Sequence, residues 1–404
     1  MYMERGISLD RAISFVKSEK TKLTLELIHL DDVHGRILGK GLKSKVNDPR
    51  FDNSAMDGWA VCKEDCSENG KTTLEIVGVS QAGAPPNHIN SGQACKIMTG
   101  APIPIGANAI VMVEDSDIEG NNVIISGPAR KTYIRHKGEN ISKGKEALPT
   151  GHFMDPASIS LAATMGYEYV EVFSKPVVGI ISTGDELAMP GTEINEWEIY
   201  ESNSFGIASL VEKMGGKPIR YETVTDSLDN LRKSLDHAAK NCDAIITSGG
   251  VSMGDWDIVR KLMESEGQIK FWRVKMRPGG PPLFGKWNNK PIFGLPGNPV
   301  SSHVVFLMLV CPWFTASFGT NVNGKPSLGK KVRVKMLNNV KGAPGKLCLR
   351  RIKITSDANG LVATTHTHQG SGNINSMVAH NGLTLLPPNI DADIGQTIDA
   401  FWFD

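Results

Sequence analysis

The spacing of apolar residues changes several times along this chain, and each change predicts a different kind of structure. Between about 175 and 320, short apolar runs alternate with amphipathic stretches. Strands are expected at 177–182, 218–224 and 244–247, and helices at 204–214, 228–240 and 258–266. The runs at 178–181 and 244–246 are uninterrupted, which is typical of strands buried on both faces of a sheet. The pattern predicts an α/β fold with a doubly wound domain.

The flanking regions have other patterns. Residues 7–40 carry helix-like spacing that glycines interrupt, which predicts a short helical region. Short β-rich runs are expected at 58–61, 73–79, 109–113 and 122–126, a helix from Asp155-Pro156 to about 165, and β alternation after 330. The expected division is 1–46 plus 138–174 as a discontinuous helical and mixed linker and dimerisation domain, 47–137 as a β-rich domain, 175–326 as the doubly wound domain, and 327–404 as a small C-terminal β domain.

Charge and composition narrow the class of protein. The 44 Lys and Arg balance 43 Asp and Glu, so no overall attraction to nucleic acid or to an anionic membrane is expected. The apolar run 304–314 is about half of the ~20 residues that a membrane helix needs, so we interpret it as a buried helix. The first twenty residues have no apolar core of a secretion signal, and the 6 cysteines are scattered. We therefore expect a cytoplasmic protein with reduced thiols.

Polar residues follow directly after the expected strands, where ligands bind in doubly wound folds. Ser182, Thr183, Gly184 and Asp185 follow the first strand. The third strand runs into a glycine-rich loop that contains Ser248, Gly249, Gly250 and Ser252. Glycines let backbone N–H groups approach an anion near a helix N-terminus, so a phosphate is the expected ligand.

Three carboxylates are expected around the same edge of the sheet. Glu186, Asp226 and Asp257 each follow a different strand. A few carboxylates, completed by water and ligand phosphates, are the ligands that Mg²⁺ prefers, so we expect Mg²⁺ as the cofactor. The alternative is that each acid caps a helix.

A basic strand and a rigid turn come next. Strand alternation puts Arg273, Lys275 and Arg277 on one face, which suits an oxyanion, although a solvated strand face has the same pattern. Pro296 and Pro299 fix an irregular backbone before a helix, either as a packing turn or as the floor of a ligand site.

Seven sequence blocks occur here in a fixed order. They are Asp52-Asn53-Ser54-Ala55-Met56-Asp57-Gly58, Met98-Thr99-Gly100-Ala101-Pro102, Ser182-Thr183-Gly184-Asp185-Glu186-Leu187, Thr247-Ser248-Gly249-Gly250-Val251-Ser252, Arg277-Pro278-Gly279, Gly294-Leu295-Pro296-Gly297-Asn298-Pro299 and His368-Gln369-Gly370-Ser371. The chain thereby resembles the molybdopterin molybdenumtransferases, the MoeA and gephyrin E-domain family, over about residues 50 to 371.

The resemblance implies an enzyme that inserts molybdenum from molybdate into adenylylated molybdopterin. It would hydrolyse the adenylate with Mg²⁺ and release molybdenum cofactor and AMP. The family is an elongated homodimer with sites shared between subunits, and its doubly wound domain is adenylyltransferase-like. The adenylyltransferase and molybdoenzymes are further expected partners.

Residue roles follow from the same resemblance. Asp57 and Thr99 would complete the catalytic site from the partner chain, beside Glu186, Asp226 and Asp257, which handle metal and nucleotide. The residues expected to hold molybdate are Arg273, Arg277, Arg350 and Ser371, and those expected to hold the pterin nucleotide are Ser182, Thr183, Gly184, Asp185, Ser248, Gly249, Gly250, Ser252, Pro296 and Pro299.

The sequence departs from the family at two positions, and two other functions are alternatives to this interpretation. Asn140 stands where the family usually has Asp, and Gly280 where Lys is frequent. A molybdopterin adenylyltransferase would explain residues 175 to 320 alone but lacks the flanking domains. A gephyrin-like binding scaffold would need neither activity. The identity of the product discriminates among the molybdenum-inserting enzyme, the adenylyltransferase and the scaffold.

Overall fold

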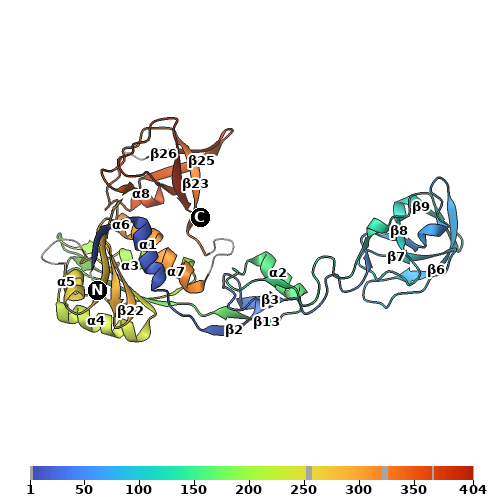
Figure 1. The fold of residues 1–404 in the computed structure, drawn as a ribbon, viewed down its shortest axis with the longest axis horizontal. Coiled ribbons are helices and arrows are strands. Elements are labelled where there is room, and N and C mark those ends of the chain that lie inside the picture. Colours follow the sequence, from blue (N-terminus) through green and yellow to red (C-terminus); the bar gives the residue numbers. More distant parts are fainter. Residues whose placement is uncertain (1–2, 252–256, 320–325, 366–367, 404) are drawn as a thin grey trace.

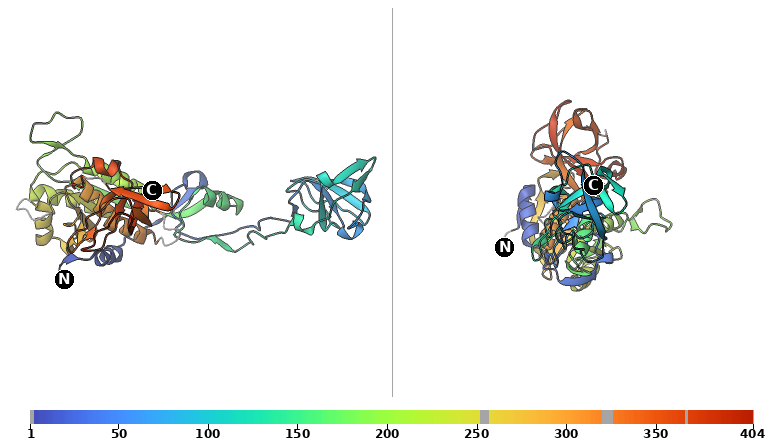
Figure 2. Two further views of the ribbon diagram at one scale, coloured as in Figure 1. Left: turned by 90° about the horizontal axis from the view of Figure 1, so that it is seen from above. Right: turned by 90° about the vertical axis from the view of Figure 1, so that its right-hand side faces the viewer.

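The computed structural model describes residues 3–251, 257–319, 326–365 and 368–403, which form an elongated molecule with most of its mass at one end. The α/β domain and a C-terminal barrel lie together at that end. A small mixed module follows, and a separate β domain lies at the far end (Figures 1 and 2). The prediction of an elongated multidomain α/β chain is confirmed.

A seven-stranded sheet forms the centre of the α/β domain. In spatial order its strands are β1 (Glu4–Ile7), β19 (Gln268–Val274), β21 (Leu283–Trp287), β22 (Lys290–Leu295), β18 (Ala244–Ser248), β14 (Val177–Ser182) and β17 (Lys217–Arg220). β17, β14, β18 and β22 are parallel neighbours, whereas β21 runs antiparallel to both β22 and β19. The parallel strands end at one edge, and that edge carries the expected site loops.

Helices cover both faces of this sheet. They are α1 (Leu9–Ser18), α3 (Asn203–Lys213), α4 (Leu228–Asn241), α5 (Ile258–Ser265), α6 (Pro299–Val305), the π-helical turn Phe306–Val310, and α7 (Cys311–Phe318). α1, α3, α6 and α7 share one apolar core with the sheet, and α4 and α5 share a second. The doubly wound arrangement predicted from the apolar runs is therefore present.

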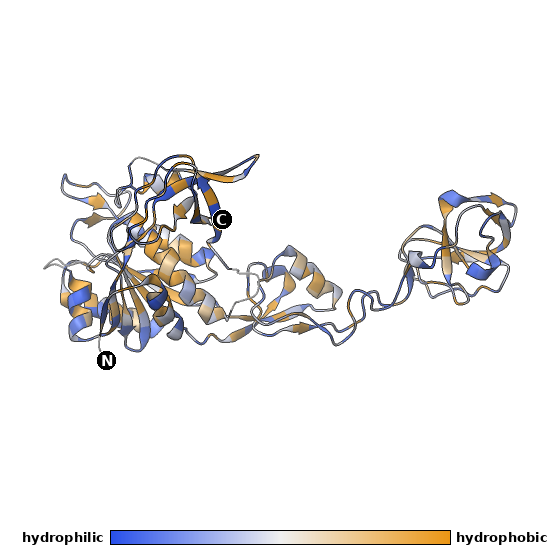
Figure 3. Ribbon diagram, turned by 45° about the horizontal axis from the view of Figure 1, so that its top comes forward, coloured by the Kyte–Doolittle hydropathy of each residue, from blue (hydrophilic) through white to orange (hydrophobic). Residues whose placement is uncertain are grey.

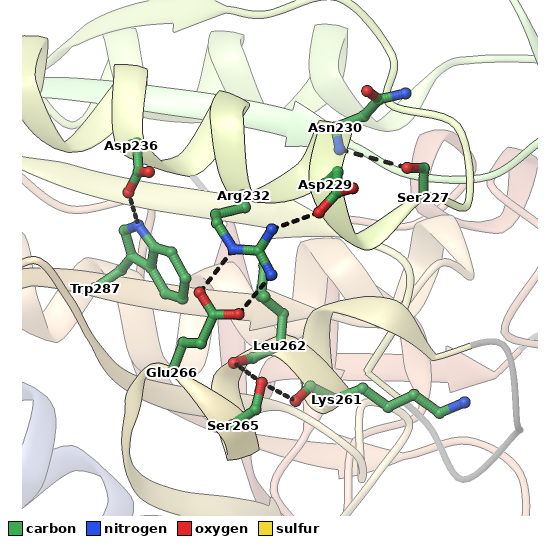
Figure 4. A network of polar contacts seen from close by, with 10 residues as sticks. All are labelled: Ser227, Asp229, Asn230, Arg232, Asp236, Lys261, Leu262, Ser265, Glu266 and Trp287. Atoms are coloured by element: carbon green, nitrogen blue, oxygen red, sulfur yellow. Dashed lines mark hydrogen bonds and ion pairs between the residues drawn. The ribbon is translucent and has the colours of Figure 1, made fainter.

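Local sequence explains how α4 and α5 are held. α4 buries Leu231, Leu235 and Ala238, spaced as one helical face requires. Arg232 of α4 donates to both carboxylate oxygens of Glu266, just beyond α5, with N···O distances of 2.7 and 2.6 Å (Figure 4). This bidentate pair ties the two helices together on their outer side.

The segment from α6 to α7 is the chain's most apolar helix. Pro299–Phe318 spans 20 residues and by length and composition could cross a membrane, but 72% of its most apolar window is buried inside the fold. Apolar residues, orange in Figure 3, concentrate in these helices and in the strands beneath them. The expectation of a buried helix over 304–314 is confirmed.

The N-terminal region departs from the prediction in two ways. Only Leu9–Ser18 is α-helical, and Leu25–His29 is a strand, β2, paired antiparallel with β13 (Tyr169–Phe173). The reason is visible in the sequence, because Leu23, Leu25 and Leu27 recur every second residue, which is strand spacing. In addition, β1 pairs with β19 and α1 packs on α7, so residues 4–18 belong with the α/β domain and not with 138–174.

The mixed module and the distal domain are joined by two extended chain segments. The module contains β2, β13, β3 (Leu42–Lys43), β12 (Glu146–Leu148), α2 (Pro156–Thr164) and the 3₁₀ turn Leu30–Asp32. The link carries β4 (Asn53–Ser54) paired with β11 (Ile134–Arg135). The distal sheet has the order β8 (Ala109–Met112), β5 (Gly58–Val61), β7 (Gln93–Ile97), β6 (Thr72–Ser80), β10 (Asn122–Ile125) and β9 (Ser116–Glu119), with 3₁₀ turns at Lys63–Asp65, Val113–Asp115 and Lys131–Tyr133.

The C-terminal region is a small closed barrel. Its strands are β23 (Gly329–Met336), β26 (Gly360–Thr365), β25 (Arg351–Asp357), β27 (Gly382–Thr384) and β28 (Thr397–Phe403), with the one-turn helix α8 (Asn375–Val378) beside them. The barrel docks on the α/β domain through two short parallel strands, β20 (Met276–Arg277) and β24 (Leu347–Cys348). This pairing fixes where residues after 348 meet the basic strand.

Candidate active site

The carboxyl ends of three parallel strands meet at one edge of the sheet. Ser182, the last residue of β14, is opposite Ser248, the last residue of β18. The Thr183 N–H donates to the Ser248 carbonyl at 3.0 Å, and the Gly249 N–H to the Leu295 carbonyl at the end of β22, also at 3.0 Å. The loops that the sequence singled out are thus brought together by the sheet itself.

These loops line a cavity of about 720 Å³, which we call the carboxylate cavity. Its lining includes most of the residues expected at the nucleotide and metal site: Ser182, Thr183, Gly184, Glu186, Asp226, Ser248, Gly249, Gly250, Asp257, Pro296 and Pro299. Asp185 does not line it but accepts the backbone N–H of Asp226 at 3.0 Å. Ser252 lies outside the described residues.

Four carboxylates influence one another at this cavity. Burial raises the pKa of Asp226, and the neighbouring charges of Asp185, Glu186 and Asp257 raise it further. Asp257 also stands at the N-cap position of α5. The accumulated negative charge is the kind of environment that a bound cation relieves.

The oxygen donors at this cavity match one of the ways in which proteins bind Mg²⁺. Within 3–251, 257–319, 326–365 and 368–403, no three His, Cys, Asp or Glu side chains are arranged so that they could hold a metal ion by themselves. Mg²⁺ is commonly bound through one or two carboxylates, with water and ligand phosphates completing its shell. The residues fit that mode, in which the nucleotide supplies part of the coordination, and do not fit an all-protein metal cage.

Glycines keep the cavity open where the two loops approach. Gly249 and Gly250 have positive φ angles of 97° and 65°. A Cβ atom at either position would lie 3.0 to 3.2 Å from Thr183 Oγ1. Thr183 Oγ1 is itself buried and has no hydrogen-bond partner among the described residues, so it is a polar group that a ligand can satisfy.

The structure adds two residues that the sequence interpretation missed. Glu201 is buried and accepts hydrogen bonds from Ser182 Oγ at 2.9 Å and from the N–H and Oγ of Ser204 at 2.8 and 2.6 Å. Asn203 donates its Nδ2 to Ser248 Oγ at 2.8 Å and to the Gly297 carbonyl at 2.7 Å, while its Oδ1 has no partner in the part of the chain that the structure describes. The local sequence carries no signal for this role, because Glu201 acquires it only through burial against Ser182 and Ser204.

A second cavity, of about 660 Å³, lies on the other side of the Pro296 turn and is basic. It is lined by Arg273, Lys275, Arg277, Lys346, Arg350, Gln369 and Ser371, and no carboxylate is among its lining residues in the part of the chain that the structure describes. We call it the arginine cavity. Its charge suits an anionic ligand.

The barrel's docking strands build this cavity. The Leu349 N–H donates to the Arg277 carbonyl at 2.8 Å, which places Arg350 next to Arg277. The Val300 N–H, in the first turn of α6, donates to the Ser371 carbonyl at 3.1 Å. The four residues expected to hold molybdate therefore line one space, and Lys346 is a cation that the sequence interpretation missed.

The two cavities adjoin. Pro281, Pro296 and Asn298 line both of them. The Gly294–Pro299 turn thus forms a shared wall, with carboxylates and glycine loops on one side and guanidinium groups on the other.

Asp57 and Thr99 form a separate pair in the distal domain. Asp57 Oδ1 accepts the Thr99 N–H at 2.6 Å and Thr99 Oγ1 at 2.8 Å, and these donors lower the pKa of Asp57. Both side chains are exposed. Within one chain this pair lies at the opposite end of the molecule from the cavities (Figure 1).

The fold and the cavities define a class: multidomain α/β proteins whose ligand site lies at the strand ends of a doubly wound domain, between that domain and a small barrel. Three family models match the chain. They are the MoeA N-terminal region, domains I and II, over residues 7–166, the probable molybdopterin binding domain over 179–316, and the MoeA C-terminal region, domain IV, over 333–402.

Relatives and solved structures agree with these matches. The chain is 34% identical over 383 residues to the molybdopterin molybdenumtransferase of Haemophilus influenzae, covering 93% of this chain and 94% of that one. It is 34% identical over 374 residues to molybdopterin molybdenumtransferase 2 of Mycobacterium tuberculosis, covering 90% and 91%. The crystal structure of the molybdopterin biosynthesis moeA protein from Pyrococcus horikoshii OT3 has a TM-score of 0.85 at 25% identity and covers 98% and 100%. The chain belongs to the molybdopterin molybdenumtransferase (MoeA) family of enzymes.

Proposed function

We propose that this enzyme inserts molybdenum from molybdate into adenylylated molybdopterin, with Mg²⁺-dependent hydrolysis of the adenylate and release of molybdenum cofactor and AMP. The observation that carries the proposal is the pair of adjoining cavities with opposite charge. One offers carboxylates and glycine loops to a metal-bound phosphate, and the other offers guanidinium groups to an oxyanion.

The residues of the two cavities would have different roles. In the carboxylate cavity, the Gly250 backbone N–H and the Thr183 hydroxyl, which has no partner among the described residues, would receive the nucleotide phosphates. One or two of Glu186, Asp226 and Asp257 would hold Mg²⁺ together with the nucleotide phosphates, and the ion would supply positive charge that stabilises the adenylate phosphate during hydrolysis. In the arginine cavity, Arg273, Arg277, Arg350 and Ser371 would hold molybdate.

Pro281, Pro296 and Asn298 would keep the two ligands in fixed relative positions, because these residues form the wall between the cavities. Adenylate hydrolysis and metal insertion would thus occur side by side. Glu201 is buried and accepts hydrogen bonds from Ser182 and Ser204, so it would position Ser182 in the lining of the carboxylate cavity.

The expected homodimer explains the separate pair in the distal domain. Asp57 and Thr99 are exposed and far from the cavities of their own chain, so a second copy of the chain would bring them to this site. We also propose that the protein acts in the cytoplasm and meets the adenylyltransferase and molybdoenzymes there.

A product assay tests the proposed activity. Purified enzyme with adenylylated molybdopterin, Mg²⁺ and molybdate should release AMP, and omission of molybdate or Mg²⁺ should abolish the release. Adenylylation of molybdopterin from ATP would instead indicate an adenylyltransferase, and neither reaction would favour a binding scaffold. The adenylyltransferase alternative leaves unexplained why Lys346, Arg350 and Ser371 of the C-terminal region line the second cavity.

Subunit mixing tests the shared site. Asp57→Ala and Asp257→Ala chains should each be inactive, because each lacks one contribution to every site. Exchanged subunits should regain about a quarter to a half of wild-type activity, since one site of each hybrid dimer keeps both side chains. No recovery after subunit exchange has been demonstrated would contradict a site built from two chains.

A further inference from the structure

Three arginines converge on one tryptophan beside the arginine cavity. The guanidinium carbons of Arg5, Arg260 and Arg273 lie 4.7, 4.9 and 5.5 Å from the centre of the Trp272 ring. All three are within the distance at which a cation interacts with an aromatic ring. Together with Gly6, these four residues line a separate cavity of about 390 Å³, which we call the Trp272 cavity.

Each arginine comes from a different element. Arg5 is on β1, and Arg260 is on α5, which the Arg232–Glu266 pair anchors (Figure 4). Trp272 is on β19 and fixes its ring by donating Nε1 to the Val251 carbonyl at 3.0 Å. The convergence is therefore a product of the tertiary fold and not of neighbouring positions in sequence alone.

The backbone at Arg273 contributes to the arrangement. Its φ angle is +71°, in the left-handed region that residues with a Cβ rarely adopt. Such conformations persist where the surrounding structure enforces them, and they concentrate at functional sites. Here the Arg273 N–H donates to the Pro282 carbonyl at 2.8 Å, which holds the residue in this conformation.

The positive charge of this cluster is only partly balanced. Glu264 lies 4.0 Å from Arg5 and 3.7 Å from Arg260. No ion pair of Arg273 is found in the chain as far as the structure describes it. The Arg260 side chain is only 18% exposed, and its Nε is buried with no hydrogen-bond partner among the residues that the structure describes. Within this described part of the chain, three cations accompany one acid and an unused buried donor, an environment in which an anion is stabilised.

The Trp272 cavity and the arginine cavity share two lining residues. Gly6 and Arg273 line both. An anion bound at Trp272 would therefore share Arg273 with an anion bound near Arg277 and Arg350. Gly6 has no side chain to separate the two spaces.

We propose that Arg5, Arg260 and Arg273 form a second anion site, specific for a tetrahedral dianion, next to the arginine cavity. The identification of that dianion as molybdate, held there before it moves to Arg277 and Arg350, rests on the proposed function. The anion site itself rests on the three guanidinium groups, the unpaired Arg260 Nε and the cavity that they line.

Calorimetric titration of the full-length chain with molybdate tests this site. Wild-type protein should bind two molybdate ions per chain. Arg260→Ala should reduce the affinity of the Trp272 cavity for molybdate at least about tenfold, as expected for loss of a charged hydrogen-bond donor. The binding event in the arginine cavity should remain. Arg350→Ala should remove molybdate binding in the arginine cavity and leave the binding event at Trp272. Arg333→Ala, which removes an exposed arginine on the barrel, is the matched control and should leave both.

Two further variants keep the test independent of folding. Arg260→Lys preserves the charge and should retain binding at intermediate affinity. Glu264→Gln removes the competing acid and should tighten molybdate binding about threefold. The same titrations with inorganic phosphate show whether the site accepts any tetrahedral dianion, and chloride should not compete at equal ionic strength.

The results separate this site from the activity. If Arg260→Ala and Glu264→Gln both leave molybdate and phosphate binding unchanged, the arginines only pack on Trp272 and the proposal is overturned. If the wild-type chain binds two molybdate ions but releases no AMP from adenylylated molybdopterin, the proposed function fails while the anion site stands.

Discussion

The carboxylate cavity and the arginine cavity share a wall but have opposite chemistry. Glu186, Asp226 and Asp257 line the first, and Arg277 and Arg350 line the second. The first is built mainly by loops at the ends of parallel strands, with Gly372 and Ile374 of the C-terminal region also in its lining. The second exists only because the barrel docks its β24 strand alongside β20.

This difference gives the two sides of one turn opposite charge. On the carboxylate side, burial and the neighbouring acids raise the pKa of Asp226. In the proposed function, a cation with its nucleotide would relieve the carboxylate side and an oxyanion would relieve the arginine side. Removal of charges from one cavity should therefore impair binding of the ligand proposed for that cavity and leave binding in the other cavity intact.

The largest effect is expected in the carboxylate cavity. Glu186→Gln should reduce AMP release by about a hundredfold or more, because it removes a metal-rim charge without changing side-chain size. Mg²⁺ titration of AMP release measures this effect. Glu193→Gln makes the same change on an exposed loop outside the cavity and should have no effect. An unchanged rate and Mg²⁺ requirement in Glu186→Gln would remove this residue from the site.

A smaller and differently directed effect is expected in the arginine cavity. Arg277→Ala should raise the molybdate concentration for half-maximal AMP release by about ten- to a hundredfold, which corresponds to ~1.5–3 kcal/mol for a charged hydrogen bond. Binding of adenylylated molybdopterin should change little. Arg277→Lys should retain part of the function, because the charge remains while the forked donor is lost. Weakened nucleotide binding with normal molybdate dependence would place the phosphates at Arg277.

The smallest effect is expected from a residue behind the arginine cavity. Arg351 is fully buried and donates Nε to Ser376 Oγ and Nη2 to the Gly370 carbonyl, both at 3.0 Å. Burial and the neighbouring Arg350 lower its pKa. Arg351 therefore positions the loop that presents Ser371.

Arg351→Gln should raise the molybdate requirement by about two- to tenfold, the range expected for lost hydrogen bonds to neutral groups, and should lower the melting temperature. The maximal rate of AMP release at saturating molybdate should stay near the wild-type value. Titration of AMP release and thermal unfolding measure the two effects, and Arg351→Lys should restore part of both. A loss of maximal rate with unchanged molybdate dependence would contradict a positioning role.

The sequence predicted best what depends on local pattern. The strand expected at 177–182 is Val177–Ser182, and the helix expected at 228–240 is Leu228–Asn241. Strand ends in a parallel sheet converge by topology, so the sequence alone predicts that the loops containing Glu186, Asp226 and Asp257 lie at one edge of the sheet.

Features that depend on packing between distant segments were not predictable in this way. Lys346 reaches the arginine cavity only through the β20–β24 pairing, and Glu201 gains its role from burial against Ser182. The pairing of Leu25–His29 with β13, more than a hundred residues later, is another such feature, although the strand spacing itself is visible in the sequence. Nothing in the local sequence around these residues specifies the partner.

One measurement tests most directly the assignment of two ligands to two cavities. Crystals grown with adenylylated molybdopterin, Mg²⁺ and molybdate should show anomalous scattering from molybdenum between Arg277, Arg350 and Ser371. The adenylate phosphates should lie beside Gly249, Gly250 and the carboxylates of Glu186 and Asp226. Adenylate phosphates bound against Arg277, or molybdenum among the carboxylates, would contradict the assignment.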